Sequence, residues 1–248
     1  MRQEEIWDAE AAQSYDTPGT GMFAPDVLGP TVDRLTELAG GGRALEFAIG
    51  TGRVAIALAE RGVPVTGIEL SQPMIDQLRT KVDEATIPVV VGDMATSRVP
   101  GEFALVYLVY NTISNLQTQA EQVACFRNAA AHLEPGGFFV IEVVVPDLRR
   151  LPPGETTRVF SRSPGYVGFD EYTDLTAGQV LWSHHWRTDG DGSSVETFSM
   201  PFRYVWPSEL DLMARLAGMT LRERHADWTR APFTGDSTSH VSVWQKDG

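Results

Sequence analysis

Hydrophobic residues along most of the chain alternate between short continuous runs and stripes with helical spacing. Predicted strands lie at residues 43–48, 64–68, 87–91, 103–109 and 138–145. Between them, stripes such as Met74, Ile75, Leu78 and Val82 recur at the three- and four-residue spacing of one helix face. Because apolar strands alternate with amphipathic helices, the pattern predicts a doubly wound α/β fold with a mostly parallel sheet.

The pattern changes after residue 145. Residues 146–165 are rich in Pro and Arg and are expected to form a connection. Strand-like runs follow at residues 166–172, 179–188 and 195–204, and Asp189–Ser193 between the last two has the composition of a hairpin turn. We therefore expect a small antiparallel β insertion after the fifth strand, outside the parallel sheet.

The remaining segments lie at the two ends of the chain. Helices are predicted at residues 4–14 and 25–38, and a helix opened by Pro207 precedes strands at 219–225 and 240–245. The expected organisation has three parts: N-terminal helices at 1–42, a core at 43–145 with 205–248, and the insertion at 146–204.

The charge and the cysteine content exclude several classes of partner. The 248 residues carry 33 Asp and Glu against 20 Lys and Arg, for a net charge of −13, and no basic cluster could grip nucleic acid. The single cysteine, Cys125, cannot form an internal disulfide, and no apolar run reaches the length of a membrane span. We therefore expect a cytoplasmic protein with neither nucleic acid nor membrane as a partner.

The turn after the first strand reads Glu46-Phe-Ala-Ile-Gly50-Thr-Gly52. Glycines at such a junction allow a tight turn and close approach of a ligand to the start of the next helix. Glu69 ends the second strand and Asp93 follows the third. Since the carboxyl ends of parallel strands meet at one edge, these acids suit the ribose and the amino group of an adenosine.

The same glycines leave two alternatives open. Residues 50–55 also fit the G-x-G-x-x-A pattern of NAD(P)-dependent oxidoreductases. Two features weigh against that function: a helical preamble precedes the motif, and Glu46 is placed to hold a ligand ammonium group. The other alternative is a non-catalytic protein that binds an adenosine-containing cofactor.

Four segments together resemble the motifs of class I S-adenosylmethionine-dependent methyltransferases that act on small molecules: Glu46–Gly52, Ile68–Ser71, Gly92–Met94 and Leu133–Gly137. The resemblance covers residues 43–145 closely and 207–246 in outline. It implies a seven-stranded sheet with an antiparallel last strand and S-adenosylmethionine as the cofactor. It also implies methyl transfer to an N or O nucleophile of a small-molecule acceptor, in natural-product tailoring, with no metal required.

The resemblance assigns roles to individual residues. It implies that Glu69 binds the ribose, that Met74 packs near the adenine, and that Asp93 with the Met94 backbone reads the adenine edge. Ala48 stands where the family commonly has another glycine. The cofactor-binding residues expected are Tyr15, Glu46, Ala48, Gly50, Gly52, Glu69, Leu70, Met74, Asp93, Met94, Tyr110 and Asn111.

Residues outside these motifs supply the catalytic candidates. Residues 7–16 resemble the lid helix of small-molecule methyltransferases, so Tyr15 is expected over the sulfonium. Residues 109–115 look like the Asn-Ser segment of glycine and sarcosine N-methyltransferase relatives, which brings Tyr110 and Asn111 toward the methyl donor. His184 and Arg203, with Tyr15, are the catalytic candidates expected on the acceptor side.

The aromatic-rich insertion is expected to form a roof over the acceptor, the surface of a homodimer, or both. His184 and His185 are adjacent on a predicted strand and therefore point to opposite faces. This arrangement argues against a paired metal site, and no metal ligand is predicted.

Overall fold

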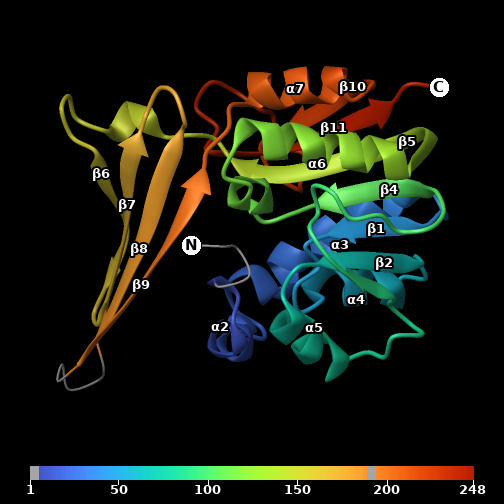
Figure 1. Cartoon of the computed structure of the whole chain (residues 1–248), viewed down its shortest axis with the longest axis horizontal. Coiled ribbons are helices and arrows are strands. Elements are labelled where there is room, and N and C mark those ends of the chain that lie inside the picture. Colours follow the sequence, from blue (N-terminus) through green and yellow to red (C-terminus); the bar gives the residue numbers. More distant parts are fainter. Residues whose placement is uncertain (1–5, 189–193) are drawn as a thin grey trace.

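The computed structural model describes residues 6–188 and 194–248 and contains two separate sheets (Figure 1). The strands of the seven-stranded sheet, sheet A, are β1 Ala44–Phe47, β2 Val65–Glu69, β3 Val89–Val91, β4 Phe103–Leu108, β5 Leu133–Val144, β10 Met219–His225 and β11 Ser239–Lys246. Their spatial order is β10-β11-β5-β4-β1-β2-β3, and β11 alone is antiparallel to its neighbours. The predicted doubly wound fold with an antiparallel last strand is therefore confirmed.

Helices cover both faces of sheet A. They are α3 Pro25–Ala39, α4 Arg53–Glu60, α5 Gln72–Arg79, α6 Gln119–His132 and α7 Pro207–Leu216. Leu35 of α3 and Leu58 of α4 are fully buried in one apolar layer, and Phe126 of α6 and Leu210 of α7 are fully buried in the other. The alternation of apolar residues along the strands thus fills two cores, and the carboxyl ends of the strands are left free for a ligand.

A short helix near the N-terminus packs outside these two layers. Helix α2, Ala9–Tyr15, begins where the Asp8 carboxylate caps the Ala11 N–H at 2.9 Å, and it packs against α5. The 3-10 turn η1, Gly21–Phe23, follows and leads into α3. We call residues 7–23 the lid. Among the described residues, no helix combines the length and the apolar composition that crossing a bilayer requires.

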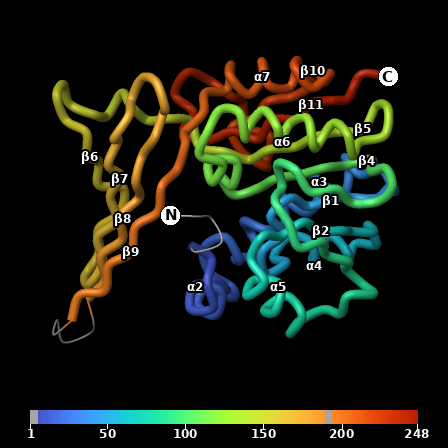
Figure 2. The backbone as a smooth tube through the Cα atoms, viewed as in Figure 1, coloured from blue at the N-terminus to red at the C-terminus, as the bar shows by residue number. Residues whose placement is uncertain are grey.

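Sheet B is the antiparallel insertion predicted after the fifth strand. It contains β6 Thr157–Ser163, β7 Tyr166–Asp174, β8 Val180–Thr188 and β9 Val195–Arg203, in that order. Figure 2 traces the backbone from β5 out through these strands and back along β9 to α7. The predicted turn at 189–193 lies outside the described residues.

Two expectations about local structure were wrong. Residues 146–165 were expected to be a connection, but they contain the short turn η3, Leu148–Arg150, and strand β6. Strand β6 forms because it pairs with β7. Its two apolar residues do not alternate with polar residues in the way that predicts a strand. The fifth strand was expected at residues 138–145, but β5 begins at Leu133, directly after α6 ends at His132, so residues 135–137 lie inside the strand.

Candidate active site

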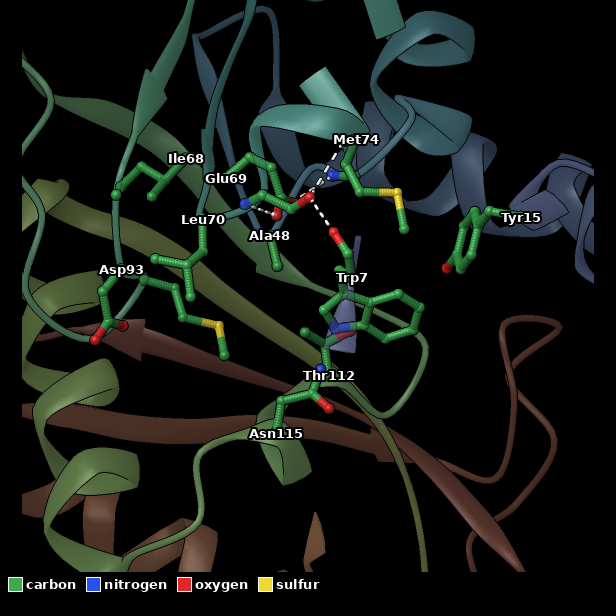
Figure 3. Close-up of a pocket in the computed structure, with 14 residues that line it drawn as sticks. Trp7, Tyr15, Ala48, Ile68, Glu69, Leu70, Met74, Asp93, Thr112 and Asn115 are labelled. Atoms are coloured by element: carbon green, nitrogen blue, oxygen red, sulfur yellow. Dashed lines mark hydrogen bonds between the residues drawn. The ribbon is translucent and has the colours of Figure 1, made fainter. Parts of the chain in front are cut away.

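A pocket opens at the carboxyl ends of β1, β2 and β3, beneath the lid (Figure 3). Its walls are formed by Trp7, Tyr15, Ala48, Gly50, Ile68, Glu69, Leu70, Ser71, Met74, Gly92, Asp93, Met94, Thr112 and Asn115. Most of the residues expected to bind the cofactor are in this set. Glu46, Gly52, Tyr110 and Asn111 are not.

The turn after β1 has the left-handed backbone that a glycine-rich motif predicts. Ala48, Gly50 and Gly52 have φ angles of 51°, 57° and 83°. For alanine this conformation costs about 1–2 kcal/mol, whereas glycine adopts it without that cost. A Cβ on Gly52 would lie 2.2 Å from Leu78 Cδ1. Gly52 is therefore needed for packing behind the pocket, while Ala48 and Gly50 form its wall.

Glu69 holds the turn from the opposite side. One oxygen of its buried carboxylate accepts a hydrogen bond from the Gly50 N–H and the other accepts one from the Ser71 N–H, both at 2.8 Å. Burial raises the pKa of Glu69, and these two backbone donors, together with the backbone of Leu70, partly offset the rise. Each oxygen keeps a second lone pair, so the carboxylate can still accept from ribose hydroxyls in the pocket.

Asp93 is held on one side only. Its Oδ1 accepts the Ala95 N–H at 2.7 Å, while Oδ2 has no hydrogen-bond partner among the described residues. The next residue, Met94, is fixed through its carbonyl, which accepts from the Asn128 side chain at 2.8 Å. This arrangement presents a free acceptor at the end of β3, as recognition of an adenine amino group requires.

Glu46 lies behind the turn rather than in the wall of the pocket. Its side chain is buried, and Oε2 accepts from the fully buried Tyr107 hydroxyl at 2.8 Å. Burial raises the pKa of Glu46 to about 8, so the acid is mostly protonated at neutral pH. The expected contact of Glu46 with a ligand ammonium group stays a prediction, and Glu46 is not among the residues that line the pocket.

Tyr15 projects from the end of α2 into the pocket (Figure 3). Its ring packs edge-on against Trp7 at 5.7 Å and Phe23 at 6.3 Å. Burial raises the pKa of Tyr15 to about 12. The phenol therefore serves as a hydrogen-bond donor at neutral pH and not as a base. Trp7 lines the pocket beside it, although it was not among the site residues expected from the sequence.

The lid is attached to the core by polar contacts on both sides of the pocket. The Asp16 carboxylate accepts from the Thr51 hydroxyl and from the Lys81 ammonium group, each at 2.6 Å. The Ser71 hydroxyl donates to the Trp7 carbonyl at 2.5 Å. Because Thr51 and Ser71 follow β1 and β2, two of the strands that form the pocket also hold the lid.

The segment after β4 reaches the pocket through residues that the sequence did not single out. Tyr110 and Asn111 have positive φ angles of 56° and 62°, and they turn the chain into the 3-10 helix η2, Thr112–Asn115. The Tyr110 N–H donates to the Glu142 carboxylate at 2.9 Å, and Asn111 Oδ1 accepts the Val144 N–H at 3.2 Å. These bonds hold the turn, and Thr112 and Asn115 line the pocket instead.

Neither acceptor-side candidate lies in the pocket. Arg203 is 2% exposed, and its guanidinium donates to Gln122 at 2.5 Å, Gln179 at 2.9 Å and Glu209 at 2.6 Å. These partners surround the group, so its position corrects the expectation that Arg203 faces an acceptor. His184 lies on sheet B, away from the residues that line the pocket.

The described residues contain no group of three or more His, Cys, Asp or Glu side chains arranged to hold a metal ion. What the pocket does offer is two carboxylates at neighbouring strand ends, a tight left-handed turn and an aromatic lid. This combination suits an adenosine-containing ligand with a small polar tail.

Comparison with known proteins agrees with this geometry. Residues 44–137 match the family model described as a methyltransferase domain. The solved structure of the CcbJ methyltransferase from Streptomyces caelestis is 34% identical, covers 97% of this chain and 96% of its own, and superposes with a TM-score of 0.82.

Two curated proteins are also similar. The cypemycin N-terminal methyltransferase of a Streptomyces species is 27% identical over 99% of this chain and 100% of its own length. The dTDP-3-amino-3,4,6-trideoxy-alpha-D-glucopyranose N,N-dimethyltransferase of Streptomyces venezuelae is 33% identical over 40% of each chain. With a relative at 34% identity along nearly its whole length, this chain belongs to the S-adenosylmethionine-dependent methyltransferases.

Proposed function

We propose that this methyltransferase transfers the methyl group of S-adenosylmethionine to an amine nitrogen of a small natural product. The observation that carries the proposal is the meeting of Glu69 and Asp93 at one pocket with the turn at Ala48–Gly50. Glu69 would bind the ribose hydroxyls and Asp93 the adenine amino group. The methionine part would then extend along the turn toward Tyr15.

When bound, S-adenosylmethionine supplies a methyl group that its sulfonium already activates for in-line displacement. The protein has to align an acceptor with that group and exclude water. The lid suits this task, because Trp7 and Tyr15 cover the pocket and Asp16 attaches them to the core. The Tyr15 phenol oxygen can accept a hydrogen bond from an N–H of the acceptor amine, which leaves the nitrogen lone pair free to point at the methyl group.

A nitrogen acceptor fits the chemistry of the wall better than a hydroxyl acceptor. Attack by an alcohol needs a base, and the described lining residues include no histidine or lysine. An amine needs only to lose the proton of its ammonium form. The names of two relatives, an N-terminal methyltransferase and an amino-sugar N,N-dimethyltransferase, support the same choice.

Calorimetry with S-adenosylmethionine and with NAD tests the cofactor. We expect saturable binding of S-adenosylmethionine only, as family membership demands, and binding of NAD alone would contradict the proposal. The acceptor class is tested by mass spectrometry with a short peptide bearing a free N-terminus and with a nucleotide-linked amino sugar, each beside its hydroxyl counterpart. Methylation of the hydroxyl members alone would overturn the choice of nitrogen. Cofactor binding without any transfer would favour the non-catalytic alternative.

We further propose that two copies of the chain associate through sheet B. Phe160 and Phe198 are each 41% exposed, and both rings contact His185, so they form one apolar patch. Light scattering should give the mass of a dimer for the natural protein and of a monomer for Phe198→Asp. A monomer in both cases would contradict the association.

A further inference from the structure

The contacts of the Arg203 side chain show which face of sheet B is turned toward sheet A and its helices. Residues along β9 alternate between faces, so Ser199, Pro201 and Arg203 share one. Arg203 reaches Gln122 of α6, whose amide lies 3.2 Å from the Ile113 carbonyl in η2. The face carrying Arg203 is therefore turned toward the pocket segment η2 and the helices of sheet A. We call it the inner face.

The strand registers assign the other members of the inner face. Trp182 lies opposite Pro201, His184 opposite Ser199 and Trp186 opposite Thr197. On β7, Phe169 lies opposite His184, and Glu171 lies opposite Trp182. His185, Phe160 and Phe198 belong to the outer face, which carries the proposed dimer patch.

The inner face combines aromatic rings with a polar group of three side chains. Phe169 stacks on His184 with centroids 4.8 Å apart and meets Trp186 edge-on at 5.2 Å. His184 Nδ1 lies 2.7 Å from the Ser199 hydroxyl, and His184 Nε2 lies 3.3 Å from the Glu171 carboxylate. The Trp186 side chain is 49% exposed and that of Glu171 47% exposed. Both can therefore contact a ligand.

The charges on the two faces differ. On the inner face, Glu171 is the charged group beside His184, and Arg162 lies at the other end of the face beside Val167. On the outer face, Arg187 stands two residues from His185, and burial of the ring, with a smaller effect of this guanidinium, lowers the pKa of His185. The outer face also carries carboxylates, but Asp170 and Glu196 each lie opposite an arginine, Arg158 and Arg187, whereas Glu171 lies opposite Thr157 and Trp182. A cation would thus meet a carboxylate with no arginine opposite it on the inner face, and carboxylates already paired with arginines on the outer face.

We propose that the inner face binds the acceptor, and that the acceptor is a cationic molecule with a flat apolar group. The flat group packs between Trp182 and Trp186, where an aromatic surface also attracts a cation. Glu171 accepts a hydrogen bond from the protonated nitrogen, with His184 and Ser199 as polar neighbours. This inference rests on the proposed transfer to an amine and specifies which amines the enzyme would select.

Tryptamine, which carries an indole and a primary ammonium group, is a suitable probe. It would be titrated by calorimetry into the protein loaded with S-adenosylhomocysteine. We expect saturable binding that weakens about 10-fold in Glu171→Gln, because a charged hydrogen bond is lost, and by a similar factor in Trp186→Ala. Matched outer-face variants, Glu196→Gln and Phe202→Ala, should bind tryptamine as the natural protein does.

His184→Asn and His185→Asn provide a second matched pair, since the two residues are neighbours on one strand with opposite faces. Only the first should weaken tryptamine binding. Absence of saturable binding, or equal losses on both faces, would overturn the inference. So would a change of oligomeric mass in Trp186→Ala with tryptamine binding unchanged, which would assign the inner face to a second copy. Binding of S-adenosylhomocysteine is measured first, and its failure would count against the proposed function rather than against the inner face.

Discussion

Glu69 and Asp93 end neighbouring strands at the same pocket, but their carboxylates are held in different ways. Both oxygens of Glu69 already accept backbone N–H groups, so this residue shapes the turn as well as facing the ligand. Asp93 keeps Oδ2 free. A substitution at Asp93 therefore separates recognition of the cofactor from the integrity of the fold more cleanly than one at Glu69.

For Asp93→Asn we expect the Kd of S-adenosylmethionine to rise about 10-fold. The amide can keep the bond from the Ala95 N–H, but it offers an NH₂ group where the adenine amino group needs an acceptor. Calorimetry measures the change, and the melting temperature should stay the same. Asp83→Asn is the control, since Asp83 also accepts a nearby backbone N–H, from Thr86 at 2.8 Å, but lies outside the pocket. Equal Kd values for the natural protein and Asp93→Asn would refute the role of Asp93.

The raised pKa of Glu46 predicts how the free energy of unfolding changes with pH. Burial raises its pKa from 4.5 to about 8, so between these values the folded protein keeps a proton that the unfolded chain releases. The free energy of unfolding therefore falls as pH rises through this window and levels off above it. The contribution between pH 5 and pH 8 is at most about 4 kcal/mol.

Thermal melts across this range, compared with those of Glu46→Gln, isolate the effect, because glutamine does not titrate. The exposed Glu60→Gln serves as the control and should keep the slope of the natural protein. If Glu46→Gln melts with the same pH slope as the natural protein, Glu46 is ionised in the folded state.

The sequence predicted the residues at strand ends better than those in connections. Glu69 and Asp93 could be placed because chain order alone brings the ends of parallel strands to one edge. In the connection after β4, two left-handed residues turn the backbone, so Thr112 and Asn115 line the pocket instead of Tyr110 and Asn111. No local pattern announces such a turn, since both residues are non-glycine. Trp7 was missed for a related reason: its position depends on how the lid docks.

At the scale of elements, one buried network joins sheet B to the core. Arg203 at the end of β9 connects Gln122 of α6, Glu209 of α7 and Gln179, which directly precedes β8. Gln179 has a left-handed backbone with φ of 57°, held by donation from its amide to the Tyr204 carbonyl at 3.0 Å. The orientation of the whole sheet thus depends on a few side chains at its base.

Arg203→Met should lower the free energy of unfolding by about 3–5 kcal/mol. The substitution leaves the Glu209 carboxylate, whose side chain is 15% exposed, without its cation. Urea denaturation measures the loss, and the double variant Arg203→Met/Glu209→Leu should recover part of it. Arg61→Met removes an exposed pair with Asp33 and should change stability by less than about 0.5 kcal/mol. Equal effects of the two single substitutions would rule out a special role for the network.

The lid predicts a link between its anchor and cofactor affinity. Asp16→Ala removes the bonds from Thr51 and Lys81, so helix α2 should exchange its amide hydrogens faster. We expect the Kd of S-adenosylmethionine to rise about 5-fold, because binding of the cofactor must then also order the lid. Hydrogen exchange and calorimetry test both effects. Asp26→Ala, on the exposed first turn of α3, is the control. An unchanged exchange rate in α2 would show that Asp16 does not hold the lid.

Helices and strands whose apolar residues pack against the core were predicted with nearly correct bounds. Elements whose conformation depends on pairing with another strand were not. Helix α7 and strand β10 have the predicted starts at Pro207 and Met219. Strand β6 was missed because neither of its faces is buried by a helix, so its residues carry no strong alternation. Its hydrogen bonds to β7 determine its conformation, and a pairing partner cannot be read from a single segment.

At the scale of the whole molecule, the architecture follows from the order of strands and helices. The two apolar layers cover both faces of sheet A, so the carboxyl ends of its strands are the expected place for the cofactor. Which face of sheet B is turned toward that edge could not be predicted, because it depends on one buried arginine and its partners. The length of the chain divides accordingly into a sheet that binds the donor and a smaller one without a helical cover.

Sheet B leaves the core after β5 and returns at α7, and both β5 and β9 pack against η2. Its strands are thus a single loop-out of the chain attached at one place. The segment between Val145 and Trp206 could therefore be exchanged, by evolution or by protein engineering, without changing the part of the enzyme that binds the methyl donor. Retaining Gln122 and Glu209 with an arginine at the last position of the new sheet would keep the joint intact. A chimera made in this way would have the acceptor preference of the protein that supplied its sheet B.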